Sequence, residues 1–65
     1  MRIRLNGRQR DVSEGLTVSE LLSELQLKGP LAVERNEKIC PKQLHQQTTL
    51  EQGDILEIVT IVGGG

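Results

Sequence analysis

The sequence predicts an α+β fold in which one main helix crosses one face of a mixed sheet of about five strands. Residues 1–6 alternate between apolar and polar side chains, as a half-buried strand does, and a later segment repeats apolar residues at helical spacing. In addition, residues 55–62 form the most apolar segment and come last. Because a helix with one apolar stripe needs a sheet face to cover, we expect this last strand to lie centrally beside the first.

The first two strands are predicted to form a hairpin. Asn6-Gly7 directly follows the alternating segment, and this dipeptide is typical of a type I′ turn, which needs positive φ at both central residues. Residues 8–12 would form the returning strand. Their polar side chains place that strand at an edge of the sheet.

The helix is predicted to begin at Thr17 with a capping box. The Thr17 hydroxyl can accept from a free N–H of the first turn, and Glu20 can reach back to the Thr17 N–H. The apolar positions that follow at helical spacing are Val18, Leu21, Leu22 and Leu25. Gly29-Pro30 is expected to end the helix, because glycine supplies a left-handed cap and proline cannot continue the turn.

The remaining segments are predicted to be a strand at 31–35, a turn at Asn36-Glu37, a short strand at 38–40, a polar segment over 42–50, a turn at Gln52-Gly53-Asp54 and the last strand at 55–62. Within the polar segment, Leu44 and Leu50 are expected to reach the core. The order of two strands, one helix and three strands is that of the β-grasp, or ubiquitin-like, fold. We divide the chain into a β-grasp domain over 1–62 and a flexible glycine tail over 63–65.

The last strand is apolar on both faces. We assign Leu56 and Ile58 to the helix-covered face, because Glu57 must point to water. This leaves three apolar side chains on the open face: Ile55, Val59 and Ile61. They could form a thin second layer of packing under the 42–50 segment, or an exposed apolar patch for a protein partner.

Composition excludes several classes of function. A chain of 65 residues forms one domain, without room for a deep active-site cleft. It has no Phe, Tyr or Trp to stack nucleic-acid bases, and a net charge of −1 attracts no polyanion. One Cys and one His make neither a disulfide framework nor a zinc site unaided. Since no apolar run approaches the roughly 20 residues of a membrane span, we expect a cytoplasmic protein that binds no metal, cofactor, nucleic acid or membrane.

Individual side chains offer no catalytic arrangement of their own. Cys40 is expected to be a buried or half-buried spectator thiol, and His45, beyond Pro41, is interpreted as a loop residue rather than a base. Half of the basic residues fall in the first ten positions: Arg2, Arg4, Arg8 and Arg10. A solvated strand face is the favoured interpretation of these arginines. Partner docking is the alternative, and a nucleic-acid patch is disfavoured by the lack of aromatic residues.

The sequence ends in Val62-Gly63-Gly64-Gly65. One interpretation is a frayed end. The other is a substrate tail, because three extended residues reach about 10 Å at ~3.3–3.6 Å each. Without Cβ atoms, such a tail would fit a narrow channel of an ATP-using enzyme. Joining its terminal carboxylate to AMP would make an acyl phosphate that sulfide, a thiol or an amine can attack.

Several motifs together identify a family. They are Asn6-Gly7, Thr17-Val18-x-Glu20-Leu21-Leu22, Val33-Glu34-Arg35-Asn36, Gln52-Gly53-Asp54 before Glu57-Ile58-Val59, and the terminal Val62-Gly63-Gly64-Gly65. With these motifs, essentially the whole chain resembles the ThiS family, the sulfur carriers of thiamine biosynthesis. The terminal Gly-Gly at this length is the most specific of them.

The resemblance implies a carrier with no catalytic residues of its own. An E1-like adenylyltransferase of the ThiF type would activate the Gly65 carboxylate with ATP and Mg²⁺. A sulfur donor such as a cysteine desulfurase would then convert the adenylate to a thiocarboxylate, and a thiazole synthase of the ThiG type would accept the sulfur. Gly63 and Gly64 would thread the partner's active site. The partners would dock on the open sheet face, at Ile55, Val59, Ile61 and Val62.

Three alternatives stay open. The first is a sulfur carrier of another pathway, such as the small subunit of molybdopterin synthase or a carrier for cysteine or tRNA thiolation; the molybdopterin subunit is usually longer and tends to contain aromatic residues. The second is a ubiquitin-like modifier joined to lysines, since amine attack uses the same adenylate. The third is a plain interaction module in which the tail is incidental.

Overall fold

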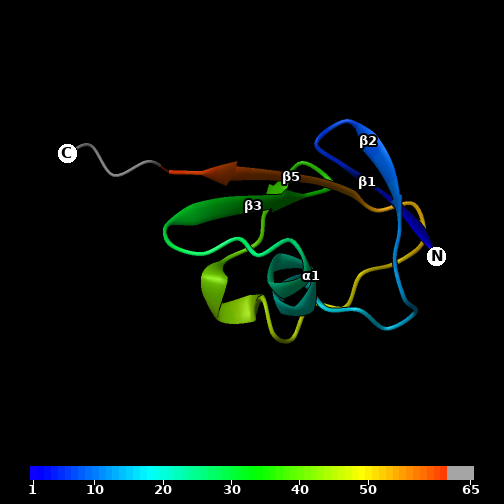
Figure 1. Cartoon of the computed structure of the whole chain (residues 1–65), viewed down its shortest axis with the longest axis horizontal. Helices are drawn as coiled ribbons and strands as arrows, with labels where there is room; N and C mark the ends of the chain where they lie inside the picture. The colour runs from blue at the N-terminus through cyan, green and yellow to red at the C-terminus, as the bar shows by residue number, and fades with distance from the viewer. Residues whose placement is uncertain (62–65) are drawn as a thin grey trace.

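A five-stranded mixed sheet forms one layer of the molecule and one helix forms the other (Figure 1). The computed structural model describes residues 1–61. Its elements are β1 (Arg2–Leu5), β2 (Arg8–Asp11), α1 (Val18–Glu24), β3 (Leu31–Arg35), β4 (Lys38–Ile39), the 3₁₀ turn η1 (Lys42–Leu44) and β5 (Ile55–Thr60). The strand order is β2-β1-β5-β3-β4, with β5 central, parallel to β1 and antiparallel to β3. The predicted β-grasp fold and the central last strand are therefore confirmed.

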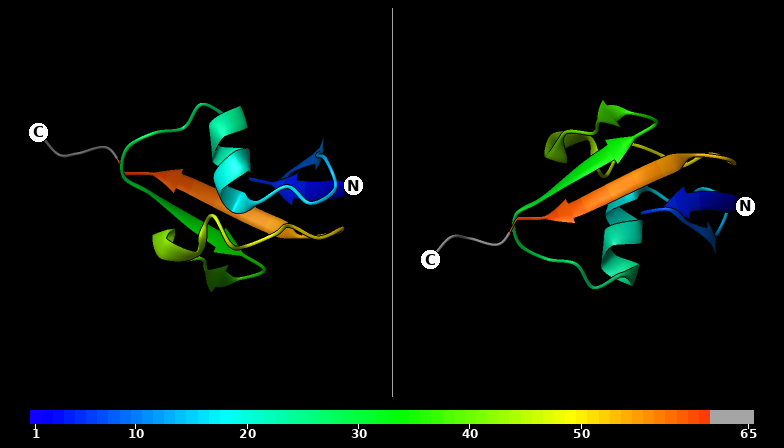
Figure 2. Two further views of the ribbon diagram at one scale, coloured as in Figure 1. Left: turned by 90° about the horizontal axis from the view of Figure 1, so that it is seen from below. Right: turned by 90° about the horizontal axis from the view of Figure 1, so that it is seen from above.

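The first hairpin has the turn that its sequence predicts. Asn6 and Gly7 have φ values of 49° and 83°, which suit a type I′ turn. Strand β2 lies at the sheet edge, as its polar sequence indicates. Figure 2 shows this hairpin beside β5, at the end of the molecule where the N-terminus lies.

Helix α1 begins as predicted and ends earlier than predicted. Both capping-box bonds are present: the Glu20 N–H donates to Thr17 Oγ1 at 3.1 Å, and the Thr17 N–H donates to Glu20 Oε1 at 2.9 Å. The prediction that Gly29-Pro30 ends the helix is wrong, because the helix stops at Glu24 and Gln26 takes the left-handed conformation, with φ of 58°.

A Schellman motif closes the helix at this earlier point. The Leu27 N–H donates to the Leu22 carbonyl at 3.1 Å, and the Gln26 N–H donates to the Ser23 carbonyl at 3.0 Å. Leu22 and Leu27 both pack against the core. Closing the helix here therefore keeps both apolar side chains on the protein side and outweighs the strain of a non-glycine residue at positive φ.

The core lies between α1 and the inner face of the sheet. Its buried apolar residues are Ile3, Val12, Leu16, Val18, Leu21, Val33, Cys40, Leu50, Leu56 and Ile58. The expectation for Leu50 is confirmed, but the one for Leu44 is wrong, because Leu44 is 45% exposed. His45 is buried instead, and its ring nitrogen Nε2 lies 3.0 Å from the Cys40 carbonyl, which supplies the acceptor that a buried imidazole N–H needs.

Candidate functional site

The open face of the sheet presents apolar side chains to solvent. Ile55, Val59 and Ile61 are 50%, 61% and 55% exposed. Leu56 and Ile58 point into the core, which confirms the predicted assignment of faces. The alternative of a second packing layer is wrong, because the 42–50 segment lies on the other side of the sheet, with α1 (Figure 1).

Two backbone hydrogen bonds hold the 42–50 segment beside the helix. The Val18 N–H donates to the Thr48 carbonyl, and the Ser19 N–H donates to the His45 carbonyl, both at 2.9 Å. These bonds satisfy N–H groups of the first helical turn, which have no acceptor within the helix. The segment is therefore committed to the helix side, and the opposite face of β5 stays uncovered in the described part of the chain.

Strand register shows which other residues share the open face. Ala32 lies opposite Val59, and Arg4 lies beside Ile55. Ile39 on β4, opposite Glu34, is 65% exposed and extends the apolar surface toward that edge. We refer to the exposed apolar residues Ile39, Ile55, Val59 and Ile61 as the open-face patch. A run of exposed apolar side chains across neighbouring strands is typical of a protein interaction surface.

The C-terminal end of β5 is fixed to the rest of the domain. The Ile61 N–H donates to the Pro30 carbonyl at 2.9 Å, just beyond the last strand residue. The predicted site residues Val62, Gly63, Gly64 and Gly65 lie outside the described residues, as does the predicted division between domain and tail. The structure thus defines the residue at which the chain leaves the sheet, at the edge of the open-face patch.

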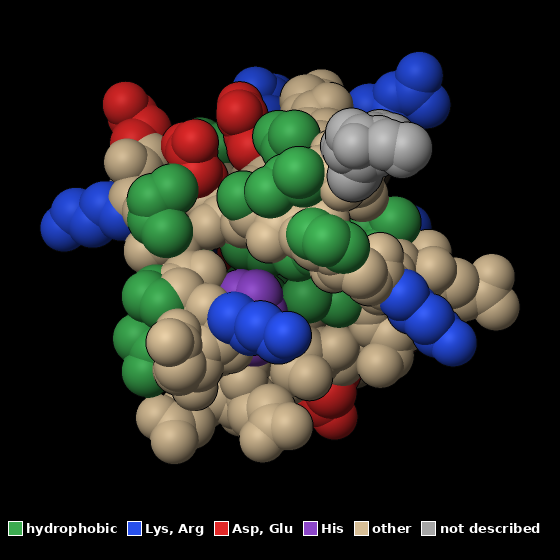
Figure 3. Space-filling view, turned by 90° about the vertical axis from the view of Figure 1, so that its left-hand side faces the viewer, with side chains coloured by type: hydrophobic (Ala, Val, Ile, Leu, Met, Phe, Trp, Pro, Cys, Tyr) green, Lys and Arg blue, Asp and Glu red, His purple; other side chains and the backbone are tan. Residues whose placement is uncertain are grey.

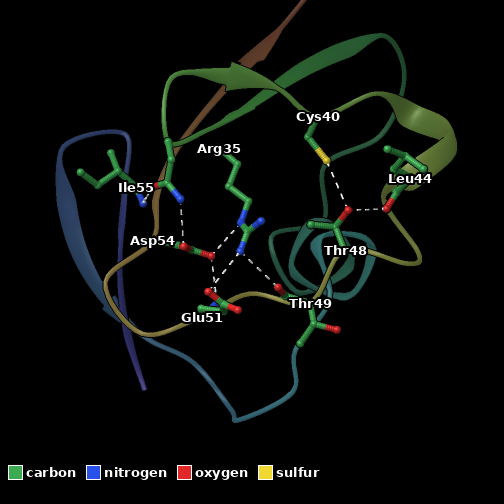
Figure 4. A network of polar contacts seen from close by, with 9 residues as sticks. Arg35, Cys40, Leu44, Thr48, Thr49, Glu51, Asp54 and Ile55 are labelled. Atoms are coloured by element: carbon green, nitrogen blue, oxygen red, sulfur yellow. Dashed lines mark hydrogen bonds and ion pairs between the residues drawn. The ribbon is translucent and has the colours of Figure 1, made fainter.

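A buried polar network holds the start of β5 (Figure 4). Asp54 is 5% exposed and accepts hydrogen bonds from Arg35 Nε at 2.8 Å, the Glu51 N–H at 2.8 Å and Asn36 Nδ2 at 3.1 Å. Burial by itself raises the pKa of Asp54, but these hydrogen bonds and the Arg35 charge outweigh it and lower the pKa below its usual value. Asn36 Oδ1 also accepts from the Ile55 N–H at 2.9 Å. The network therefore positions the strand that presents the patch, and sequence reasoning missed it.

Cys40 and His45 do not form a catalytic pair. Cys40 is buried, as expected, and its Sγ lies 3.7 Å from Thr48 Oγ1. His45 contacts the carbonyl of Cys40 rather than its thiol. Among residues 1–61, no group of three His, Cys, Asp or Glu side chains is placed to hold a metal ion.

The arginines of the first hairpin pair locally. Arg2 donates to Asp11 at 3.0 Å and to Gln9 at 3.3 Å, and the Arg2 hydrogen bond and charge lower the pKa of Asp11. Arg10 Nη2 lies 4.0 Å from Glu24. Arg4 and Arg8 are exposed. The interpretation of a solvated strand face therefore holds only in part. Arg10 lies opposite the buried Ile3 on the helix-covered side, is half-buried, and has an Nε that is buried without a hydrogen-bond partner among residues 1–61.

An open groove of about 1010 Å³ lies between the end of α1 and η1. It is lined by Leu22, Leu27, Leu31, His45, Lys28 and Lys42, among others. Figure 3 shows the histidine at its base, behind a basic side chain. Among residues 1–61, its lining holds no carboxylate and no thiol. No helix in the described part of the chain is long and apolar enough to span a lipid bilayer.

Comparisons with known proteins point to one family. The model of the ThiS family matches residues 3–65. The chain is 40% identical over 50 residues to the sulfur carrier protein ThiS of Bacillus subtilis (strain 168), covering 75% of this chain and 76% of that protein. It also aligns with the crystal structure of the thiamine biosynthesis protein ThiS from Geobacter metallireducens, with a TM-score of 0.86, 33% identity and full coverage of both chains.

A further relative is much longer than this chain. A protein named thiazole synthase from Paramagnetospirillum magneticum (strain ATCC 700264 / AMB-1) is 44% identical over 66 residues. The match covers all of this chain and 20% of that protein. The chain thus spans about one fifth of this relative and three quarters of the Bacillus carrier.

Proposed function

Because the chain belongs to the ThiS family of sulfur carriers in thiamine biosynthesis, we propose that it carries sulfur as a thiocarboxylate on Gly65. The observation that supports this assignment most directly is the family match, which extends through the three glycines to residue 65. The open-face patch, at the edge of which the chain leaves the sheet, supplies a surface by which enzymes can hold the domain while they act on its end.

The proposed chemistry begins with activation of a poor electrophile. The Gly65 carboxylate attacks the α-phosphorus of ATP, pyrophosphate leaves, and the product is an acyl adenylate. Hydrosulfide then attacks the acyl carbon, AMP leaves, and a thiocarboxylate remains. An E1-like adenylyltransferase would supply the site with its ATP and Mg²⁺. A donor such as a cysteine desulfurase would supply the sulfur as a persulfide, which a thiol reductant cleaves to hydrosulfide while being oxidised to a disulfide. The carrier contributes the tail and the docking surface, and the catalytic groups belong to the enzymes.

Glycine suits the three tail positions for a steric reason. A residue without Cβ can enter a narrow channel and leaves the carbonyl carbon open to attack. The tail residues 63–65 would thread the enzyme's active site, while Ile55, Val59, Ile61 and Val62 contact the enzyme outside it. Thiazole synthase is the proposed sulfur acceptor, because a segment similar to this chain forms part of a protein with that name.

The experiment is sulfur loading followed by intact-mass measurement. The 65-residue chain is incubated with the adenylyltransferase, Mg·ATP and sulfide, with a matched reaction lacking ATP. We expect a mass gain equal to one exchange of oxygen for sulfur, mapped to Gly65, only when ATP is present. An unchanged mass, with the enzyme shown to be active on another carrier, contradicts the proposal. A ladder of lysine conjugates would favour the ubiquitin-like modifier instead.

A further inference from the structure

Two carboxylates lie directly opposite one another on the open sheet face. Glu34 of β3 and Glu57 of β5 are partners in the antiparallel register, and both side chains are exposed. Ile39 of β4 is the partner of Glu34 on its other side. Like charges at directly opposed positions repel one another and destabilise a sheet. This arrangement therefore has a cost for the isolated domain.

Neither carboxylate forms an ion pair within residues 1–61. The acidic groups in ion pairs are Asp11 with Arg2, Glu14 with the N-terminus, Glu24 with Arg10, and Glu51 and Asp54 with Arg35. Neither Glu34 nor Glu57 has a lysine or arginine nitrogen within 4.0 Å in the described part of the chain. Arg4 on the same face lies beside Ile55 instead.

The carboxylate pair is set within apolar surface. Along β5, Glu57 lies between the exposed Ile55 and Val59, and Glu34 lies between Ile39 on β4 and Glu57 on β5. Figure 3 shows acidic side chains beside hydrophobic ones at the top of the molecule, where the sheet lies. A cation seated over the pair would be ringed by apolar contacts that exclude water, an arrangement typical of strong binding positions in interfaces.

We propose that Glu34 and Glu57 together bind one arginine or lysine side chain of the adenylyltransferase, at the centre of the contact made by the open-face patch. The planar guanidinium of arginine can donate to two carboxylates at once, so arginine fits best. The choice of enzyme rests on the proposed function; the need for a cation rests on the strand register alone. A second copy of this chain fits poorly, because two-fold packing through the pair would bring four carboxylates together.

The test measures binding without chemistry. Dissociation constants for the adenylyltransferase are determined by titration calorimetry in the absence of ATP for the wild type, Glu34→Gln, Glu57→Gln and the double variant. Glutamine keeps the shape and removes the charge. Glu37→Gln is the matched control, because Glu37 is an exposed acid at the adjacent β3–β4 turn without an ion pair within 4.0 Å.

We expect the double variant to bind about tenfold more weakly or worse, as for loss of a desolvated charge pair. The control should stay within about twofold of the wild type, as expected for a charge at the rim. The losses of binding free energy in the two single variants should not sum to the loss in the double variant, because both residues contact the same cation. The isolated double variant should melt at or above the wild-type temperature because repulsion is relieved, which separates weak binding from misfolding.

Equal dissociation constants for the wild type and the double variant overturn this inference. A loss of affinity in Glu37→Gln as large as that in the double variant also overturns it, because it would indicate a general attraction between the acidic surface and the enzyme rather than a specific site. A dimer of the free chain that dissociates in the double variant also overturns it, in favour of a second copy as the occupant. If the wild type binds the enzyme in the predicted way but gains no sulfur, the proposed function fails and the docking inference stands.

Discussion

Asn6 of the first turn bonds to Ile58 of the central strand through both polar atoms of its side chain. Asn6 Oδ1 accepts from the Ile58 N–H at 2.8 Å, and Nδ2 donates to the Ile58 carbonyl at 3.2 Å. The register of β1 with β5 covers only two residue pairs. The amide therefore extends the junction between hairpin and central strand beyond the backbone ladder.

Replacing Asn6 should destabilise the fold through two separable effects. Asn6→Gly removes only the side-chain bonds and should lower the free energy of unfolding by about 1–3 kcal/mol. Asn6→Ala adds the strain of alanine at positive φ, about 1–2 kcal/mol more. Urea denaturation of the three proteins measures both differences. Equal stability of the glycine variant and the wild type would show that solvent replaces these bonds without loss.

Acid should weaken the domain through Asp54. Its pKa is lower in the folded chain than in the unfolded chain, where it is near 3.8. The stabilisation by Asp54 is thus complete when the pH is above its pKa in the unfolded chain, and it is lost as the pH falls through its pKa in the folded chain. We expect Asp54→Asn to lower stability at neutral pH and to flatten the decline in stability as the pH falls below the unfolded-state pKa of 3.8. Chemical denaturation at a series of pH values measures this, and an unchanged acid slope would contradict it.

Val59→Asp should weaken enzyme binding while leaving the fold intact. Val59 is 61% exposed, so a carboxylate there stays solvated and the free energy of unfolding should change by about 0.5 kcal/mol or less. Binding should weaken because the bound state would bury that charge. Ile58→Asp is the control for burial and should unfold the domain, since Ile58 is 7% exposed. Calorimetry measures the effect on binding, and thermal melting measures the effect on folding. A Val59→Asp variant that unfolds contradicts the assignment of Val59 to the open face.

Removal of Gly65 should abolish sulfur loading without loss of stability. Among residues 1–61, the buried apolar residues all lie between Ile3 and Ile58, so cooperative unfolding should be that of the full chain. Loading should fail because the shortened chain places its carboxylate one residue short of the reacting centre. Intact mass reports the first result and thermal unfolding the second. Normal sulfur loading of the shortened chain would show that the enzyme does not require the carboxylate at the position of Gly65.

Cys40→Ala should leave sulfur loading unchanged. The thiol is buried against Thr48, and the backbone carbonyl of Cys40, which contacts His45, survives the substitution. Stability should fall by about 1 kcal/mol, as is common for a small truncation in a core. Loss of loading in a folded variant would place the sulfur on this thiol at some stage, contrary to the proposed route.

Local sequence signals predicted the parts of the fold that depend on neighbouring residues. The capping box of Thr17 and the positive φ at Asn6 and Gly7 were readable because each depends on a few adjacent positions. The assignment of faces in β5 was also predictable, because Glu57 interrupts an otherwise apolar strand. That assignment left open whether Ile55, Val59 and Ile61 are exposed or covered by the 42–50 segment, and only the structure shows that they are exposed.

The features that sequence did not predict depend on distant contacts. Packing of Leu22 and Leu27 ends α1 before the glycine that should have ended it. The 42–50 segment has no clear apolar period, so its buried residue, His45, could not be distinguished from Leu44. The bonds of Asp54 to Arg35 and Asn36 span 19 and 18 residues, and the opposition of Glu34 and Glu57 requires a known strand register.

The position of β5 also determines when the protein can fold during synthesis. This strand pairs with β1 on one side and β3 on the other, so the sheet remains in two separate parts until residues 55–60 have left the ribosome. A nascent chain that ends before residue 55 has hairpins but no central strand and no complete open-face patch. An enzyme that recognises this face therefore distinguishes chains synthesised at least through β5 from truncated ones before any ATP is consumed.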